Sequence, residues 1–171
     1  MRTMLIIDNM DSATGWAALG NDTTNLAASS VRLSGRYSLE FDKANGAANT
    51  VYAGAAKSIS PIDIEFDTVM PHDRVCWSVY LSSLTNVANV FLRLGSSASN
   101  YLEWRVADTT LIAGWNVCDV AIGNAYLGGT GWNPNSVSYI AVGVTFDAEA
   151  NELAGIKVDR VYLNPASMVR S

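Results

Sequence analysis

Apolar and polar side chains alternate along most of this chain. Between residues 77 and 81, the apolar Trp77, Val79 and Leu81 alternate with Ser78 and Tyr80. A period of two places successive side chains on opposite faces of a β-strand, so one face of this segment is predicted to lie in a core. The same alternation occurs in four other segments, at 37–42, 62–67, 89–94 and 101–106.

Other apolar segments add further strand candidates. These are residues 5–8, 30–33, 50–53, 117–122, 137–146 and 156–163. Clusters of turn-forming Gly, Asn, Pro and Asp separate the candidates, and no segment carries a long apolar stripe of helical period, although residues 17–28 could form a helical turn. The predicted fold class is therefore all-β: an antiparallel β-sandwich (jelly roll) forming a single domain over residues 1–171. Its core is expected at residues 4–164, followed by a short tail at 165–171.

The segment 137–146 is apolar on both faces, apart from Ser138 and Thr145. A strand without a polar face is either central in a sheet or covered by another subunit. The sequence leaves both alternatives open.

The composition excludes several classes of protein. Apolar residues make up 49% of the chain, which rules out intrinsic disorder. A net charge of -5, with only 11 Lys and Arg residues, argues against a nucleic-acid partner. No segment approaches the length of a membrane span, and residues 1–8 lack the apolar run of a secretory signal peptide, so no membrane partner is expected. The low proportion of charged residues, 16%, suggests a surface that is partly covered by partners.

Catalytic chemistry has little support in the sequence. His72 is the only histidine and lies in a Pro-His-Asp turn, where no nucleophile is indicated. Asp63, Glu65 and Asp67 lie on one face of a predicted strand with a spacing that a glycosidase could use, but nothing nearby would separate their pKa values. The three acids are interpreted as a solvated strand face. We therefore expect that the protein is not an enzyme and has no catalytic residues.

Cys76 and Cys118 are the only cysteines and are 42 positions apart. A zinc site is excluded because one histidine and two cysteines do not supply four ligands. The cysteines are predicted to be two buried free thiols, and a single disulfide is the alternative.

Five stretches of sequence carry a resemblance to a known family. They are residues 8–11 with 15–16, residues 35–41, residues 91–96 with 100–104, residues 114–116, and residues 139–142 with 156–163; the second stretch reads Gly-Arg-Tyr-Ser-Leu-Glu-Phe. In this order they resemble the galactose-binding-like jelly rolls, the family of many carbohydrate-binding modules. Similar modules occur in virion proteins of tailed bacteriophages and in bacterial surface proteins. The resemblance covers about residues 4–164 and is more specific for the fold than for a ligand.

The same resemblance implies a candidate structural calcium site. The positions that match it are Asp8 or Asp11, Glu40 and Asp159. Calcium prefers six to eight oxygen ligands, which carboxylates and backbone carbonyls supply. The alternative is that Asp8 and Asp11 cap turns and that Asp159 is hydrogen-bonded at a strand bend. No other cofactor is expected.

Aromatic residues are the candidates for carbohydrate or partner contact. Trp16, Trp77 and Trp104 are predicted to lie in the core, whereas Trp115, Tyr126 and Trp132 lie near glycine-rich turns and are candidates for stacking on sugars or for packing under loops. A second set occupies outward strand positions and has the composition of an interface or, alternatively, of the inner face of the second sheet. Its members are Tyr80, Phe91, Arg93, Tyr101 and Arg105.

Two functions follow from these observations. The first is a non-enzymatic structural protein of a bacteriophage virion, such as a capsid decoration (cement) protein or tail component, with neighbouring coat subunits as partners and a homo-oligomeric state. It would be located in the virion, which is assembled in the host cytoplasm. The alternative is a carbohydrate-binding module or adhesin that stacks glycans on exposed aromatic residues, with an extracellular location.

Overall fold

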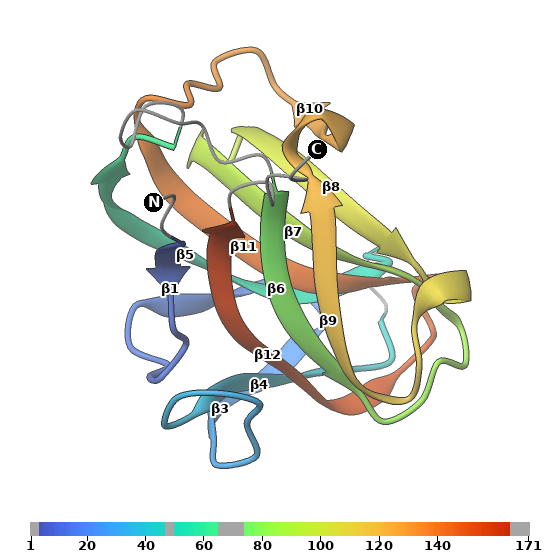
Figure 1. The fold of residues 1–171 in the computed structure, drawn as a ribbon. Helices are drawn as coiled ribbons and strands as arrows, with labels where there is room; N and C mark the ends of the chain where they lie inside the picture. The colour runs from blue at the N-terminus through green and yellow to red at the C-terminus, as the bar shows by residue number, and fades with distance from the viewer. Residues whose placement is uncertain (1–3, 47–49, 65–73, 165–171) are drawn as a thin grey trace, which may run out of the picture.

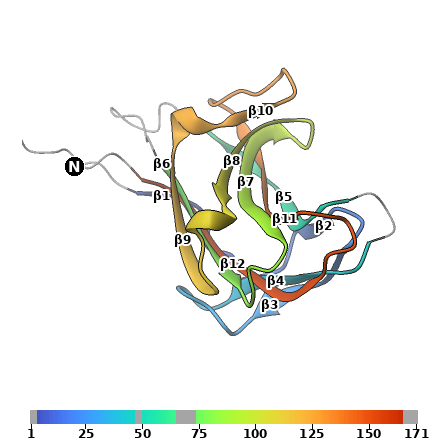
Figure 2. The same ribbon diagram turned by 90° about the vertical axis from the view of Figure 1, so that its right-hand side faces the viewer.

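Two antiparallel β-sheets pack face to face in the computed structural model, which describes residues 4–46, 50–64 and 74–164 (Figures 1 and 2). The first sheet has the strand order β3-β4-β12-β6-β9, and β1 also pairs with β12. Its strands are β1 (Leu5–Asp8), β3 (Thr23–Ser29), β4 (Ser38–Lys43), β6 (Arg74–Leu81), β9 (Gly114–Ala121) and β12 (Leu153–Asn164). The all-β sandwich predicted from the alternation is confirmed.

The second sheet has the strand order β10-β8-β7-β11-β5-β2. Its strands are β2 (Trp16–Leu19), β5 (Tyr52–Ile62), β7 (Val87–Ser97), β8 (Asn100–Ala107), β10 (Tyr126–Gly128) and β11 (Val137–Phe146). Two short 3₁₀ turns, Asp108–Thr110 and Ile122–Asn124, flank β9. Among the described residues, no helix is long and apolar enough to cross a membrane.

The inward faces of the two sheets form one apolar core. The expected inward residues are buried: Trp77, Val79 and Leu81 of β6 face the layer that contains Leu92 of β7 and Trp104 of β8. Trp16 is buried as well, as predicted. The alternation therefore identifies the inward face of each of these strands correctly.

The strand β11 is central in the second sheet, between β5 and β7. This confirms that segment 137–146 is a central strand, and coverage of its outward face by another subunit stays a prediction. Its outward face is mostly small: Ala141 and Gly143 lie between Tyr139 and Thr145.

Three predictions about local structure need correction or limits. The helical turn at 17–28 is wrong, because β2 pairs with β5, Gly20 turns the chain with a φ of +87°, and β3 pairs with β4. The strand at 30–33 is also wrong. The backbone N–H groups of Leu33 and Ser34 donate to the carboxylate of Asp159, so they do not form a strand ladder. For the predicted strand at 62–67, β5 ends at Ile62, and residues 65–67 lie outside the described part of the chain.

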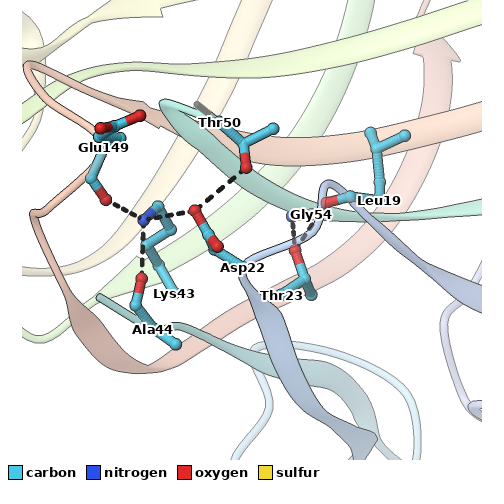
Figure 3. Close-up of polar contacts among 8 residues, drawn as sticks. All are labelled: Leu19, Asp22, Thr23, Lys43, Ala44, Thr50, Gly54 and Glu149. Carbon is cyan, nitrogen blue, oxygen red and sulfur yellow. Dashed lines mark hydrogen bonds and ion pairs between the residues drawn. The ribbon is translucent and has the colours of Figure 1, made fainter. Parts of the chain in front are cut away.

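A buried lysine connects three segments at one end of the sandwich (Figure 3). Lys43, the last residue of β4, donates from Nζ to the carbonyl oxygens of Ala44 and Glu149, both at 2.7 Å. The same ammonium lies 3.3 Å from Oδ2 of Asp22, which also accepts a hydrogen bond from Thr50 at 3.0 Å. Because both charges are buried, each needs the other and the surrounding polar groups to offset its desolvation. This contact holds the β11–β12 loop against the turn that precedes β3.

A neighbouring hydroxyl connects the two sheets. Thr23, at the start of β3, donates from Oγ1 to the carbonyl of Leu19 at 2.6 Å and accepts a hydrogen bond from the backbone N–H of Gly54 in β5 at 3.0 Å (Figure 3). It therefore satisfies a buried N–H group and fixes the edge of the second sheet relative to the first.

Candidate functional site

The outward face of the second sheet gathers aromatic and charged side chains from five strands. Because successive residues of a strand point to opposite faces, the positions opposite to the core can be assigned directly from the register. The large side chains at these positions are Tyr52 of β5, Tyr139 of β11, Phe91 and Arg93 of β7, Tyr101, Glu103 and Arg105 of β8, and Tyr126 of β10.

Small residues at the intervening positions allow the aromatic rings to pack closely against the sheet backbone. A Cβ atom added to Gly143 would lie only 2.5 Å from Cζ of Phe91, and one added to Gly128 would lie 2.4 Å from Cε2 of Tyr101. Each ring therefore covers the glycine of the adjacent strand. This close approach requires glycine at both positions, because any larger side chain would displace the ring.

Arg93 lies at the centre of this face. Its guanidinium carbon is 4.6 Å from the ring centroid of Tyr101, 4.7 Å from that of Phe91 and 5.7 Å from that of Tyr52. Arg93 donates from Nε to Oε1 of Glu103 at 2.7 Å, and its side chain is 14% exposed. No acceptor among the described residues binds its two Nη groups. The rings thus hold a cation whose N–H donors remain available to a ligand.

The second oxygen of Glu103 accepts a hydrogen bond from Nε of Arg105. The guanidinium of Arg105 also lies 4.2 Å from the ring centroid of Tyr126. Charge, stacking and the β-sheet register therefore fix the orientation of both arginines before any ligand arrives, which lowers the entropy cost of binding.

Exposure increases from the centre of the face toward β10. Phe91 and Tyr139 are buried, Tyr52 and Tyr101 are partly exposed, and Tyr126 is 56% exposed. Burial raises the pKa of the Tyr139 hydroxyl above its usual value, so this group stays protonated at neutral pH. The accessible part of the face thus offers three tyrosine rings and two guanidinium groups, which suits a flat polar ligand with apolar ring faces.

No family model matches the sequence, and no curated protein matches it either. Solved structures do match. The family 11 carbohydrate-binding module of the cellulase Lic26A-Cel5E from Clostridium thermocellum superposes with a TM-score of 0.66 at 11% identity, covering 99% of this chain and 98% of that one. A family 11 module from the same organism, in complex with a β-1,3-1,4-mixed-linked tetrasaccharide, gives 0.62 at 10% identity, with 95% and 96% covered.

A family 28 module that is specific for non-crystalline cellulose gives a TM-score of 0.54 at 12% identity, over 88% of this chain and 87% of that one. The chain has the jelly-roll fold of carbohydrate-binding modules. The resemblance seen in the sequence is therefore confirmed at the level of the fold.

The structure separates the predicted contact residues into two groups. Phe91, Arg93, Tyr101 and Arg105 come together with Tyr126 on the outward face of the second sheet, so the alternative that this set lines an inner face is wrong for them. The reason is register: these side chains alternate with the buried residues of β7 and β8.

The remaining candidates lie elsewhere. Tyr80 and Trp115 are neighbours on the outward face of the first sheet, with ring centroids 5.7 Å apart in an edge-to-face contact, and Lys157 lies 4.8 Å from the Tyr80 ring. Trp132 is partly buried and packs against the core, as its loop-packing alternative proposed. Trp115 therefore does not contribute to the face that carries Arg93.

Tyr52, Glu103 and Tyr139 belong to the face but were missed as candidates from the sequence. The alternation in residues 101–106 places Glu103 outward, whereas segment 137–146 is apolar on both faces and assigns no face to Tyr139. What the pattern did not contain was the pairing of β5 with β11 and of β11 with β7, which brings Tyr52 and Tyr139 beside Phe91 and Arg93.

The four candidate calcium ligands have protein partners of their own. Asp8 binds Lys57 at 2.8 Å and accepts a hydrogen bond from the Met10 N–H at 2.7 Å, and Glu40 lies 3.4 Å from Lys157. In the described ranges, no group of three or more His, Cys, Asp or Glu side chains is arranged to hold a metal ion.

Asp11 and Asp159 act as acceptors for loop backbone. Asp11 accepts from the N–H groups of Arg36 and Tyr37, and these bonds, with Tyr37 the larger cause, lower the pKa of its carboxyl. Asp159 accepts from Leu33 and from Ser34. The contacts match the alternative of turn caps and a hydrogen-bonded strand, and these four residues do not fit one calcium site. The calcium site implied by the resemblance is tested with a chelator.

The two cysteines are buried free thiols, as predicted. Trp77 is directly opposite Cys118 in the register of β6 and β9, so Cys118 points inward and Cys76 points to the other face of the sheet. A disulfide between them is excluded by this geometry. Burial raises the pKa of Cys76 to about 11 and that of Cys118 to about 12, so both thiols are protonated at neutral pH.

Of the three carboxylates considered for glycoside hydrolysis, only Asp63 lies in the described part of the chain. Asp63 accepts hydrogen bonds from Nδ2 of Asn135, whereas Glu65, Asp67 and His72 lie outside the described residues. The absence of catalytic activity stays a prediction from the sequence. The full-length structural matches described above are to modules that bind carbohydrate.

Proposed function

We propose that this chain is a non-catalytic carbohydrate-binding module whose binding site is the outward face of the second sheet. The observation that carries the proposal is the row of Tyr52, Arg93, Tyr101 and Tyr126, which crosses the sheet from β5 to β10. Pyranose rings have apolar faces and polar edges, and the row offers aromatic faces with hydrogen-bond donors between them.

The dimensions of the row favour a chain of sugars over a single one. Between Tyr52 and Tyr126 the row extends four strand spacings, about 19 Å, across the strands and about 13 Å along them, because Tyr126 is in register with Ala56 and not with Tyr52. A ligand of this length would contact Tyr52 at one end and Tyr126 at the other. The tetrasaccharide complex of the family 11 module supports an oligosaccharide as the first probe.

Isothermal titration calorimetry with the β-1,3-1,4-mixed-linked tetrasaccharide and with cello-oligosaccharides tests the proposal. Tyr101→Ala and Tyr52→Ala are expected to weaken binding by about tenfold or more, as truncation of a central aromatic contact does. Trp115→Ala is the matched control, because it removes an aromatic side chain from the opposite sheet. Binding that disappears in Trp115→Ala and persists in both tyrosine variants would move the site to the first sheet and contradict the proposal.

The virion role stays a prediction from the sequence, together with its coat-subunit partners, its homo-oligomeric state and its location in a particle. It is compatible with glycan binding, since a particle protein can also carry a sugar-binding face. Mass spectrometry of purified particles from a producing host, combined with analytical ultracentrifugation of the isolated protein, tests it.

A further inference from the structure

The face that carries the row of tyrosines has an excess of positive charge. Of the outward positions on the strands of the second sheet, the charged ones are Arg93, Glu103 and Arg105. Lys57 of β5 occupies a position on the opposite face of the sheet, and its side chain pairs with Asp8. Two cations and one anion leave one positive charge on this face, in a chain whose net charge is -5.

Both oxygens of the one carboxylate on this face, that of Glu103, already have partners within the protein. One oxygen of Glu103 binds Arg93 and the other binds Arg105, and the Glu103 side chain is only 6% exposed. Each arginine contributes only its Nε atom to this contact. The Nη edges of both guanidinium groups have no carboxylate partner among the described residues, so the charge of one arginine is not neutralised by the protein.

Arg105 is the more accessible of the two cations. Its side chain is 44% exposed, compared with 14% for Arg93. Stacking against Tyr126 occupies one face of the guanidinium and leaves the Nη edge free. A planar pair of N–H donors binds a carboxylate in a bidentate manner, which makes this edge more suitable for an acid than for an isolated hydroxyl.

We infer that the glycan bound by this face is acidic and contains uronic acid residues, and that Arg105 is the specificity-determining residue. The sugar rings contact Tyr101 and Tyr126, and a uronate carboxylate receives the two Nη donors of Arg105. This inference rests on the proposed function, since it requires that the face binds a glycan at all. It also gives the positive charge of the face a role in recognition.

A matched pair of ligands isolates the carboxylate. Cellotetraose and the corresponding tetramer of β-1,4-linked glucuronic acid share their linkage and differ at C6, so calorimetry on both at low salt measures the contribution of the acid. We expect the wild-type protein to bind the uronate at least tenfold more tightly. Raising the salt should weaken uronate binding more than cellotetraose binding, because an exposed ion pair is screened.

Variants then assign the effect to one residue. Arg105→Gln should lower the ratio of uronate affinity to cellotetraose affinity by about tenfold, because it removes the charged contact that only the uronate makes. Arg36→Gln is the control, because Arg36 is also exposed and stacks on a tyrosine, with 5.5 Å to the Tyr37 ring, at a distant site.

The outcomes separate the two proposals. Equal binding of the two tetramers, or an Arg105→Gln variant that keeps the uronate preference, overturns the acidic-glycan inference and leaves the glycan-binding face intact. Uronate binding that falls equally in Arg36→Gln and Arg105→Gln also overturns it, since the attraction is then a property of net charge. If the wild-type protein binds none of the glycans tested, the proposed function itself is contradicted.

Discussion

Nε of Arg93 lies 2.7 Å from Oε1 of Glu103, and the other oxygen of that carboxylate binds Arg105. The pair with Arg93 is largely buried, whereas the pair with Arg105 is open to solvent on one side. The same carboxylate therefore takes part in one contact that is expected to matter for stability and one that is expected to matter mainly for recognition.

Glu103→Gln should destabilise the fold by about 3 kcal/mol, because it leaves the buried guanidinium of Arg93 without its counter-charge. Urea unfolding at neutral pH measures the change. Arg105→Gln, which removes the exposed partner of the same carboxylate, should cost less than about 1 kcal/mol. Equal losses in the two variants would show that burial of Arg93 does not distinguish the two contacts.

Gly143→Ala should destabilise the second sheet by about 1–3 kcal/mol through overpacking. The added methyl group would lie 2.5 Å from Cζ of Phe91 and 2.4 Å from the carbonyl oxygen of Ala53, so the ring and the strand must shift. Gly123→Ala is the control, since a Cβ atom there meets nothing within 4 Å, and its unfolding free energy should stay within about 0.5 kcal/mol of the wild type. A Gly143→Ala variant as stable as Gly123→Ala would contradict the position of Phe91.

Lys43→Met should lower the free energy of unfolding by about 3–5 kcal/mol, because it leaves the buried carboxylate of Asp22 without its counter-charge. The double variant Lys43→Met/Asp22→Asn should be more stable than the sum of the two single changes predicts, since the partners interact directly. Chemical denaturation of all four proteins completes the cycle. Strictly additive losses would mean that the ammonium is held by the carbonyls of Ala44 and Glu149 alone.

Removal of divalent cations with EDTA should leave Tm unchanged. The carboxylates of Asp8, Asp11, Glu40 and Asp159 already bind protein donors, so no cation is needed to hold the loops that they anchor. A cation that bound the folded state would raise Tm with its concentration. A fall in Tm with EDTA that added calcium reverses is the result that would establish a calcium site.

The two thiols should make the fold sensitive to alkaline pH. Their pKa values are raised from 9.0 to about 11 for Cys76 and about 12 for Cys118 by burial, so the folded state holds these protons more tightly than the unfolded chain does. The resulting stability is fully present below pH 9 and is lost progressively as the pH rises through the folded pKa values.

Urea unfolding as a function of pH, with the double variant Cys76→Ala/Cys118→Ala as the reference, measures this contribution. The wild type should lose more stability than the variant between pH 9 and pH 11. Parallel curves would show that the thiols do not titrate differently in the two states. A thiol reagent at pH 8 should likewise react slowly with the folded protein and rapidly after denaturation.

The alternation of apolar residues was sufficient to predict which face of a strand lies in the core. It placed Trp77 and Trp104 inward and Tyr80 and Phe91 outward, and all four assignments hold with respect to the sandwich. It could not predict that Tyr80 and Phe91 lie on opposite sheets. That outcome depends on whether a strand pairs with β12 or with β11, which are distant in sequence from both.

Loops that depend on distant side chains were also beyond prediction. Residues 30–33 have the composition of a short strand, but the carboxylate of Asp159, which is 126 positions from Leu33, binds their backbone donors. Similarly, Arg93, Arg105 and Tyr126 were separate candidates in the sequence. Only the pairing of β8 with both β7 and β10 makes them neighbours.

The small residues along β11 have a consequence for how such a protein can change. Ala141 and Gly143 carry no large side chain, so little projects from the middle of the outward face. The inward residues Val142 and Val144 belong to the core. Substitutions at Ala56, Ser58 or Thr145 could therefore reshape ligand preference with little effect on folding. Apart from Glu103 and Gly143, whose contacts also hold the sheet together, the outward positions can therefore vary while the inward positions keep the core intact.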